Sequence, residues 1–296
     1  MRIKSFFVSL IAVSLICFSF ANAQAPTRIT ILYDAFGKSS TLKMDWGFSA
    51  LVESNGKRIL FDTGNNAEFF AYNVKALGVD LTKLDFVVIS HRHGDHTSGL
   101  NYLLSVNPNV PIYAPRETFG VFGASIPPAF YRKMESSPPE MRYFAGKTPD
   151  HLSSGSPWPS GKFIWIDSLT QVGEGLFLIS TVSQIPGTLE LRELSLSVRT
   201  PKGQVIICGC SHPGIERIVD ASRPIDARIH LIAGGFHLVS TPDSTVERIA
   251  TALHEKWNVD LIAPGHCTGE PAFAIFQKVF GRKYLYAGLG SVLEIP

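Results

Sequence analysis

The sequence predicts an α/β fold built around one large core, and three observations support this. The run Phe86-Val87-Val88-Ile89 is continuously apolar, which is typical of a strand buried on both faces. The segment from Ala67 to Leu77 has helical character and stops at Gly78, a residue suited to the end of a helix. Hydrophobic residues make up 45% of the 296 positions, which favours one domain over two small ones.

Local patterns place the other elements. The turn signal Ser54-Asn55-Gly56 predicts a hairpin between two strands. Ser244 and Glu247 have the spacing of a capping box, which predicts the start of a helix. Apolar residues recur along that helix at helical intervals, at Val246, Ile249, Ala250, Leu253 and Trp257. The predicted strands besides 86–89 are Arg28 to Tyr33, Phe48 to Glu53, Arg58 to Phe61, Leu176 to Val182, Leu194 to Arg199, Val205 to Cys208, Ile229 to Ala233 and Leu261 to Ala263.

Residues 1–23 are a predicted secretory signal peptide. Arg2 and Lys4 precede an uncharged stretch from Phe6 to Phe20, and Ala21-Asn22-Ala23 is a small-residue cleavage pattern. A membrane anchor is the alternative, but roughly 15 apolar residues are too few to cross a hydrocarbon core of roughly 30 Å. We therefore expect residues 24–296 to be a periplasmic or secreted domain without a stable membrane anchor.

The charge balance favours small-molecule substrates. The chain has 27 basic and 25 acidic residues, and removal of Arg2 and Lys4 with the signal peptide would leave 25 of each. No excess of positive charge remains to attract nucleic acid, so we expect no nucleic-acid partner. The sequence leaves the oligomeric state open.

Residues 116–162 form a predicted insert in this domain. Prolines recur through it, including Pro127-Pro128 and Pro138-Pro139, so it cannot be regular throughout. Its aromatic residues favour packing over disorder, and we expect it to fold over the site as a lid that shapes substrate choice. The alternative is that the insert is a surface loop without a functional role.

The motif His91-Arg92-His93-Gly94-Asp95-His96 is the strongest indication of function. It follows the predicted strand 86–89, and ligands this dense indicate a loop that wraps a metal centre. Imidazoles with a carboxylate suit zinc, with manganese or iron as alternatives. The sequence therefore predicts a metal site at the end of this strand.

Three more histidines follow predicted strands in the same way. His212, His237 and His266 come shortly after the strands that end near Cys208, Ala233 and Ala263. Since ligands gather beyond the carboxyl ends of strands in α/β sheets, we expect these histidines to meet the motif at one rim. We interpret the other histidines as structural: His151 in the insert, His230 within a strand and His254 on the capped helix.

Around these residues the chain resembles the metallo-β-lactamase superfamily. The pattern His91-x-His93-x-Asp95-His96 matches the superfamily signature, and Phe61-Asp62-Thr63-Gly64 matches the turn that often precedes it. Further runs resemble one branch, which includes an archaeal dihydropterin aminobenzene-phosphate synthase and many uncharacterised bacterial hydrolases. These runs are Trp46 to Ser49, Gly209 to Gly214, Gly234 to Leu238 and Pro264 to Gly269.

The resemblance implies an αββα sandwich with two divalent metal ions at one edge. In the mechanism that we predict, His91, His93 and His212 hold one metal, while Asp95, His96 and His266 hold the other. A hydroxide activated between the metals would attack an ester, phosphoester or lactone. Asp95 and His237 are the candidate catalytic residues, with His237 facing the substrate as an acid or orienting group.

The chain departs from the superfamily at two ligand positions. Cys210 stands after Gly209, where a bridging aspartate is usual, and no isolated histidine lies near Leu176 to Pro186. His212 is a candidate for one of these vacancies, which leaves open whether one or two ions bind. Two other classes of protein stay open, a non-catalytic metal-binding protein and a non-haem iron redox enzyme.

Two cysteines adjoin the predicted ligands. Cys210 lies two residues from His212, and Cys267 follows His266 directly. A disulfide is one interpretation for an exported protein, but the resembling branch has intracellular members with both cysteines. We therefore expect free thiols that support the site.

Overall fold

The computed structural model describes residues 26–39, 41–117 and 158–296, together with residues 125–126, 135–136, 138, 142, 147 and 152–153. The predicted signal peptide and most of the predicted insert lie outside the described residues, so both stay predictions. Within the described chain, no helix is long and apolar enough to cross a membrane.

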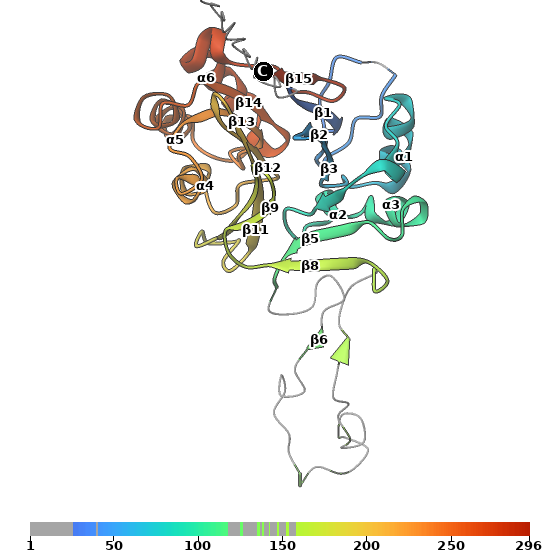
Figure 1. Ribbon diagram of the computed structural model, residues 1–296. Helices are drawn as coiled ribbons and strands as arrows, with labels where there is room; N and C mark the ends of the chain where they lie inside the picture. The colour runs from blue at the N-terminus through green and yellow to red at the C-terminus, as the bar shows by residue number, and fades with distance from the viewer. Residues whose placement is uncertain are drawn as a thin grey trace, which may run out of the picture.

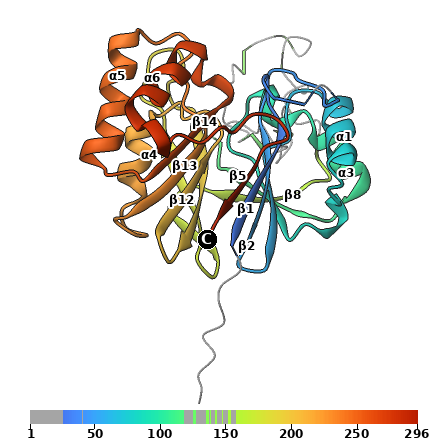
Figure 2. The same ribbon diagram turned by 90° about the horizontal axis from the view of Figure 1, so that it is seen from above.

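Two large sheets lie face to face and carry helices on their outer faces, which gives four αββα layers (Figures 1 and 2). Helices α1 (Ala67–Ala76) and α3 (Leu100–Val106) cover one sheet. Helices α4 (Ile215–Ser222), α5 (Asp243–Thr251) and α6 (Glu270–Phe280) cover the other. The predicted α/β class and the αββα sandwich are therefore confirmed.

The first sheet has the strand order β15-β1-β2-β3-β4-β5-β8. Neighbours from β15 to β3 are antiparallel, and those from β3 to β8 are parallel. Its strands are β1 (Thr27–Tyr33), β2 (Ser49–Ser54), β3 (Lys57–Phe61), β4 (Phe86–Val88), β5 (Pro111–Pro115), β8 (Lys162–Ile166) and β15 (Val292–Ile295).

The second sheet has the order β14-β13-β12-β11-β10-β9, and only β12, β13 and β14 are parallel. Its strands are β9 (Thr170–Gly173), β10 (Leu176–Val182), β11 (Arg192–Thr200), β12 (Gly203–Cys208), β13 (Ile229–Gly235) and β14 (Leu261–Gly265). The remaining elements are β6 (Ser125–Ile126), β7 (Leu152–Ser153), α2 (Gly94–Thr97), and the short helices η1 (Leu81–Lys83), η5 (Ala252–Lys256), η6 (His266–Thr268) and η7 (Gly281–Lys283).

The apolar run in β4 illustrates why the sheets are buried on both faces. Phe86 and Val88 point into the core between the two sheets, whereas Val87 and Ile89 point to the core beneath α1 and α3. Every residue of the run is therefore removed from water, which explains why the pattern does not alternate. The strand itself ends at Val88, one residue before the predicted end.

The predicted caps have mixed outcomes. The side chain of Asn66 accepts the backbone N–H groups of Glu68 and Phe69 at the start of α1, and Gly78 follows the helix with φ of +67°. The capping box at Ser244 is wrong: α5 begins at Asp243 after Pro242 and has no side-chain cap. Pro242 already gives the chain an extended entry (ψ 141°), so Ser244 falls inside the first turn.

Candidate metal centre

The candidate site lies where the carboxyl ends of parallel strands from both sheets meet. The loop after β4 carries the dense motif, and the loops after β12, β13 and β14 carry one histidine each. Backbone strain is concentrated here: of the seven non-glycine residues with positive φ in the described chain, four lie at this rim, and such conformations persist only where surrounding contacts hold them. These four are Asp62, Ser211, His237 and His266.

One ligand cluster contains His91, His93 and His212. One nitrogen of each ring lies within 4.8 Å of the others, so a single cation could contact all three. His91 Nε2 is 3.0 Å from His93 Nδ1. Burial and neighbouring imidazoles lower the pKa of His91 well below its usual value and that of His93 to about 4, so both rings are neutral at pH 7, as metal binding requires.

The second cluster contains Asp95, His96 and His266, again with ligand atoms within 4.8 Å of one another. Asp95 Oδ2 lies 3.3 Å from His266 Nε2 and 3.5 Å from His96 Nε2. Burial raises the pKa of Asp95, but the two imidazoles outweigh it and hold the pKa below its usual value. The carboxylate is therefore charged and available as a ligand.

A buried carboxylate orients the histidines of the motif. Asp62, directly after β3, accepts hydrogen bonds from Ser90 N (2.7 Å), Ser90 Oγ (2.7 Å) and His96 Nδ1 (2.7 Å). Because the Ser90 hydroxyl donates to Asp62, it accepts the Nδ1 proton of His91 at 2.8 Å. His91 thus carries its proton on Nδ1, which leaves its Nε2 free to bind a metal. Burial lowers the pKa of His96, but Asp62 and Asp95 outweigh it and raise the pKa to about 9, so a metal at Nε2 of that ring must displace a proton.

Glu193 on β11 holds His212, the third histidine of the first cluster. This fully buried carboxylate accepts the backbone N–H groups of Cys210, Ser211 and His212 at 2.9, 2.6 and 2.9 Å. It also contacts His212 Nδ1 at 3.1 Å, which leaves Nε2 of that ring free. Burial raises the pKa of Glu193, but His212 and the backbone donors outweigh it and keep the group charged.

His266 provides the test of whether the site suits a metal. Its ring is buried, and neither ring nitrogen makes a hydrogen bond, although Nε2 lies 3.3 Å from Asp95 Oδ2. An unpaired buried nitrogen costs about 1–3 kcal/mol, which a bound cation would relieve at Nε2. Imidazole and carboxylate groups suit Zn²⁺, Mn²⁺ or Fe²⁺, so the residues present fit the implied ions.

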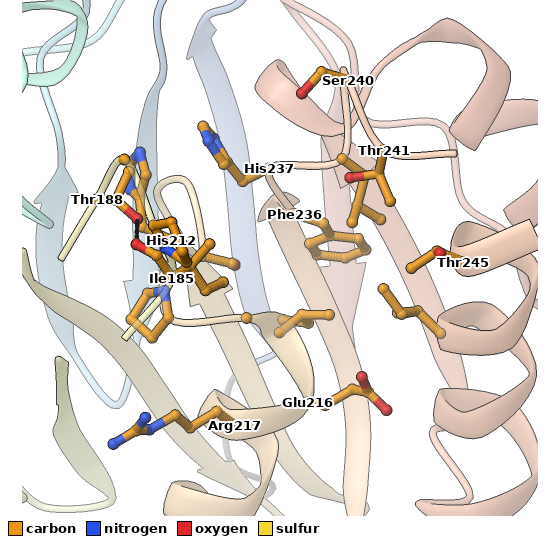
Figure 3. A pocket seen from close by; sticks show the side chains of 18 of the residues that line it. Ile185, Thr188, His212, Glu216, Arg217, Phe236, His237, Ser240, Thr241 and Thr245 are labelled. Carbon is orange, nitrogen blue, oxygen red and sulfur yellow. Dashed lines mark hydrogen bonds between the residues drawn. The ribbon is translucent and has the colours of Figure 1, made fainter. Parts of the chain in front are cut away.

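His237 stands at the mouth of a pocket beside the first cluster. Its ring lies 4.2 Å from that of His212 between centroids, and it is exposed where most neighbours are buried. The pocket encloses about 650 Å³ and extends past Phe236 to the first turns of α4 and α5 (Figure 3). Figure 3 shows the hydroxyl groups of Thr188, Ser240, Thr241 and Thr245 around it. A small molecule could thus occupy the pocket with one end against His212 of the first cluster.

The structure brings all seven predicted site residues to this rim: His91, His93, Asp95, His96, His212, His237 and His266. Their roles as ligands or catalysts stay predictions. His230 lies apart and pairs with Asp260 at 3.0 Å, while His254 packs on Phe280. His151 lies outside the described residues. Sequence reasoning noticed Asp62 only as part of a motif and missed Glu193; the available signal was an acidic residue placed beside Leu194 near the start of a predicted buried strand.

Gly209, directly after β12 of the second sheet, lies very close to the hydrogen-bonded pair Ser90 and Asp62. A Cβ atom at Gly209 would lie 2.2 Å from Ser90 Oγ and 2.9 Å from Asp62 Oδ2. We predict that Gly209→Ala displaces the Ser90 hydroxyl and lowers the free energy of unfolding by about 1–3 kcal/mol, with weaker zinc binding. Gly94→Ala is the control, since its Cβ would meet only Ser98 Oγ at 3.6 Å. Equal stability of both variants in urea titrations would contradict this.

Comparison with known proteins identifies the family. The metallo-beta-lactamase superfamily profile matches residues 47–266, so this chain belongs to that superfamily. The sequence is 31% identical over 282 residues to the 7,8-dihydropterin-6-methyl-4-(beta-D-ribofuranosyl)-aminobenzene-5'-phosphate synthase of Methanocaldococcus jannaschii, covering 90% of this chain and 95% of that protein. The predicted superfamily and branch are thereby confirmed.

Solved structures share the fold of this chain. The chain superposes with a TM-score of 0.67 and 30% identity on Tm1679, a metal-dependent hydrolase of the beta-lactamase superfamily, covering 91% of this chain and 99% of that one. It also shares the fold of YhfI from Bacillus subtilis, with a TM-score of 0.56, 16% identity, and 92% and 100% of the two chains covered.

Proposed function

We propose that this protein is a metal-dependent hydrolase that binds two divalent ions, one in each histidine cluster. The observation that carries the proposal is the pair of adjacent three-residue clusters, in which two buried carboxylates, Asp62 and Glu193, orient His91, His96 and His212. Divalent ions bound there would supply a lowered pKa for water and polarisation of the scissile bond.

The chain's own residues would position the substrate and move its protons. Asp95, between the two imidazoles of its cluster, is charged and can accept a proton from an attacking water as well as bind a cation. His237 faces the pocket, and nearby Cys267, despite partial burial of the ring, raises its pKa from the usual value. A protonated His237 can donate to a leaving group or orient a substrate oxygen.

We propose esters, phosphoesters or lactones of small molecules as substrates. The pocket suits such compounds because it combines hydroxyl groups with an apolar wall and is lined by His212 of the first cluster and by His237 (Figure 3). The balanced charge of the chain supports a small molecule over nucleic acid. We further propose that the protein works after export, in the periplasm or outside the cell, because residues 1–23 read as a signal peptide.

Metal removal is the decisive experiment for this function. We predict that dialysis against a chelator abolishes hydrolysis of a panel of aryl esters, phosphoesters and lactones, and that zinc, manganese or iron restores it. Bound metal should also raise the melting temperature, since a ligand at 100 times its Kd stabilises the folded state by about 2.7 kcal/mol. Metal analysis should give two ions per chain.

Each alternative class of protein predicts a different result in that experiment. A protein that binds two ions tightly but hydrolyses nothing on the panel would be a non-catalytic metal-binding protein or a group-transfer enzyme, as the archaeal relative's name indicates for that protein. A redox enzyme would require iron and show activity that depends on oxidation state. Hydrolysis that survives complete removal of metal would overturn the proposal.

A further inference from the structure

Cys210 and Cys267 place two thiols in contact beside the clusters. Their sulfur atoms are 3.4 Å apart, and the residues are only 3% and 2% exposed. Cys210 follows β12 and Cys267 lies in η6 after β14, so the pair connects two neighbouring loops of the rim. Both are free cysteines in the structure, as the sequence analysis expected.

The distance between the two sulfur atoms is only slightly longer than a disulfide requires. A disulfide has an S–S distance of about 2.05 Å, so the sulfurs must approach each other by about 1.4 Å. The backbone is held on both sides, because Glu193 accepts the N–H of Cys210, and the carbonyl of Cys267 accepts those of Leu238 and Val239. Side-chain movement must therefore provide most of the approach.

Closing this bond would disturb the second cluster. Cys210 Sγ lies 3.2 Å from His96 Nε2, the ring nitrogen on the side away from Asp62 and the predicted metal ligand. Cys210, His91 and His96 also form a group that could hold a metal ion, and movement of the sulfur toward Cys267 removes a soft donor from the side of His96. Cys267 directly follows His266, whose backbone is in the left-handed region with φ of +46°, so the part of the approach that the backbone provides is transmitted to His266. Either shift changes the surroundings of a predicted metal ligand, His96 or His266.

We propose that Cys210 and Cys267 form a reversible thiol–disulfide modification site that weakens metal binding when a peroxide oxidises it. Peroxide oxidises one thiol to a sulfenic acid, and one water is released. The second thiol then attacks the sulfur of the sulfenic acid, and the displaced hydroxide takes up the proton of that thiol and leaves as a second water. Two thiols and one hydrogen peroxide thus give one disulfide and two waters. The effect on turnover rests on the proposed hydrolase function, whereas disulfide formation and metal loss do not.

The third cysteine of the domain is a matched control. Cys208 is also buried, but it packs in the core between the second sheet and α4, α5 and α6. Burial raises its pKa to about 12, so it stays a thiol at neutral pH. Cys208→Ser keeps a polar atom next to Ser195 and Ser211 and leaves the proposed pair intact.

The test uses purified protein, hydrogen peroxide as the oxidant and zinc as the probe. Reduced, zinc-free protein should lose the thiols of Cys210 and Cys267, but not that of Cys208, and yield a linked peptide two hydrogens lighter. Its Kd for zinc, measured by calorimetry, should rise at least tenfold, and dithiothreitol should reverse both changes. Protein loaded with zinc before the treatment should be oxidised more slowly.

The variants make the outcome unambiguous. Cys208→Ser should form the disulfide as the wild type does, whereas Cys210→Ser and Cys267→Ser should not form it. Three unmodified thiols after peroxide, oxidation of single sulfurs to sulfinic acid, or a disulfide that leaves zinc affinity unchanged would each overturn the proposal. A protein that shows the switch in zinc binding but hydrolyses no panel substrate would instead count against the proposed function alone.

Discussion

Asp95→Ala is expected to lower kcat/KM by about 10³-fold or more while the protein stays folded. The substitution leaves the second cluster with two imidazoles and no carboxylate, although Asp95 Oδ2 lies within 3.5 Å of both His96 Nε2 and His266 Nε2. Metal-based stabilisation of charge is worth several kcal/mol, and each 1.36 kcal/mol is a factor of ten in rate. The Asp95 side chain is 19% exposed, so its truncation creates no closed cavity.

The control for this variant is Asp260→Ala. Asp260 also contacts an imidazole, since its Oδ2 lies 3.0 Å from His230 Nδ1, but this pair is outside the clusters. We expect Asp260→Ala to keep its zinc content and its kcat/KM. Steady-state kinetics, metal analysis and thermal unfolding of the metal-free proteins should be compared. Unchanged turnover in Asp95→Ala would show that this carboxylate has no part in the chemistry.

The strands that lead to the rim were predictable because their signals are local, whereas β5, β8, β9 and β15 were not predicted. β10 spans Leu176–Val182, as its pattern predicts, and the helical periodicity from Val246 to Leu253 is buried as expected. Placing four histidines beyond strand ends required only the general geometry of α/β sheets. The convergence at one rim therefore followed from the order of strands and loops along the chain.

The carboxylates that orient the histidines were harder to predict from the sequence, because their contacts join residues that are far apart along the chain. Glu193 reaches His212 across 19 residues, and Asp62 reaches His96 across 34. The Asp34 carboxylate accepts the backbone N–H of His266 across 232 residues. Neither periodicity nor propensity encodes such pairs. They become visible only when the two sheets are packed together, as where Leu194 N of β11 donates to Ser90 O beside β4 at 2.8 Å.

The same packing explains why Cys210 and His212 could be assigned to the rim but not to exact roles. The loop after β12 turns sharply at Ser211, with φ of +65°, and Glu193 accepts three consecutive N–H groups from it. This directs Cys210 toward His96 and His212 toward His91. One buried carboxylate on another strand thus decides which cluster each of the two side chains joins.

Glu193→Gln is accordingly expected to raise the Kd for zinc by about 10- to 100-fold, the range seen when groups that orient metal ligands are removed. The amide oxygen of glutamine can replace only one carboxylate oxygen. Its NH₂ group would then face N–H donors, either those of Cys210 and Ser211 at Oε1 or those of His212 at Oε2. Buried donors without an acceptor cost about 1–3 kcal/mol each, so metal-free protein should also unfold at lower urea concentration.

The cobalt-substituted protein separates an orienting role from a purely structural one. If Glu193 fixes the His212 ring, Glu193→Gln should change the visible absorption of bound cobalt and reduce kcat more than it raises KM. Asp260→Asn is the matched control, because it removes the charge from another imidazole–carboxylate contact, that with His230, outside the clusters. A Glu193→Gln protein that loses stability yet keeps wild-type zinc affinity and cobalt spectrum would mean that Glu193 supports only the loop. We expect instead that affinity, spectrum and kcat change together, since the same carboxylate oxygen holds both the backbone and the ring of His212.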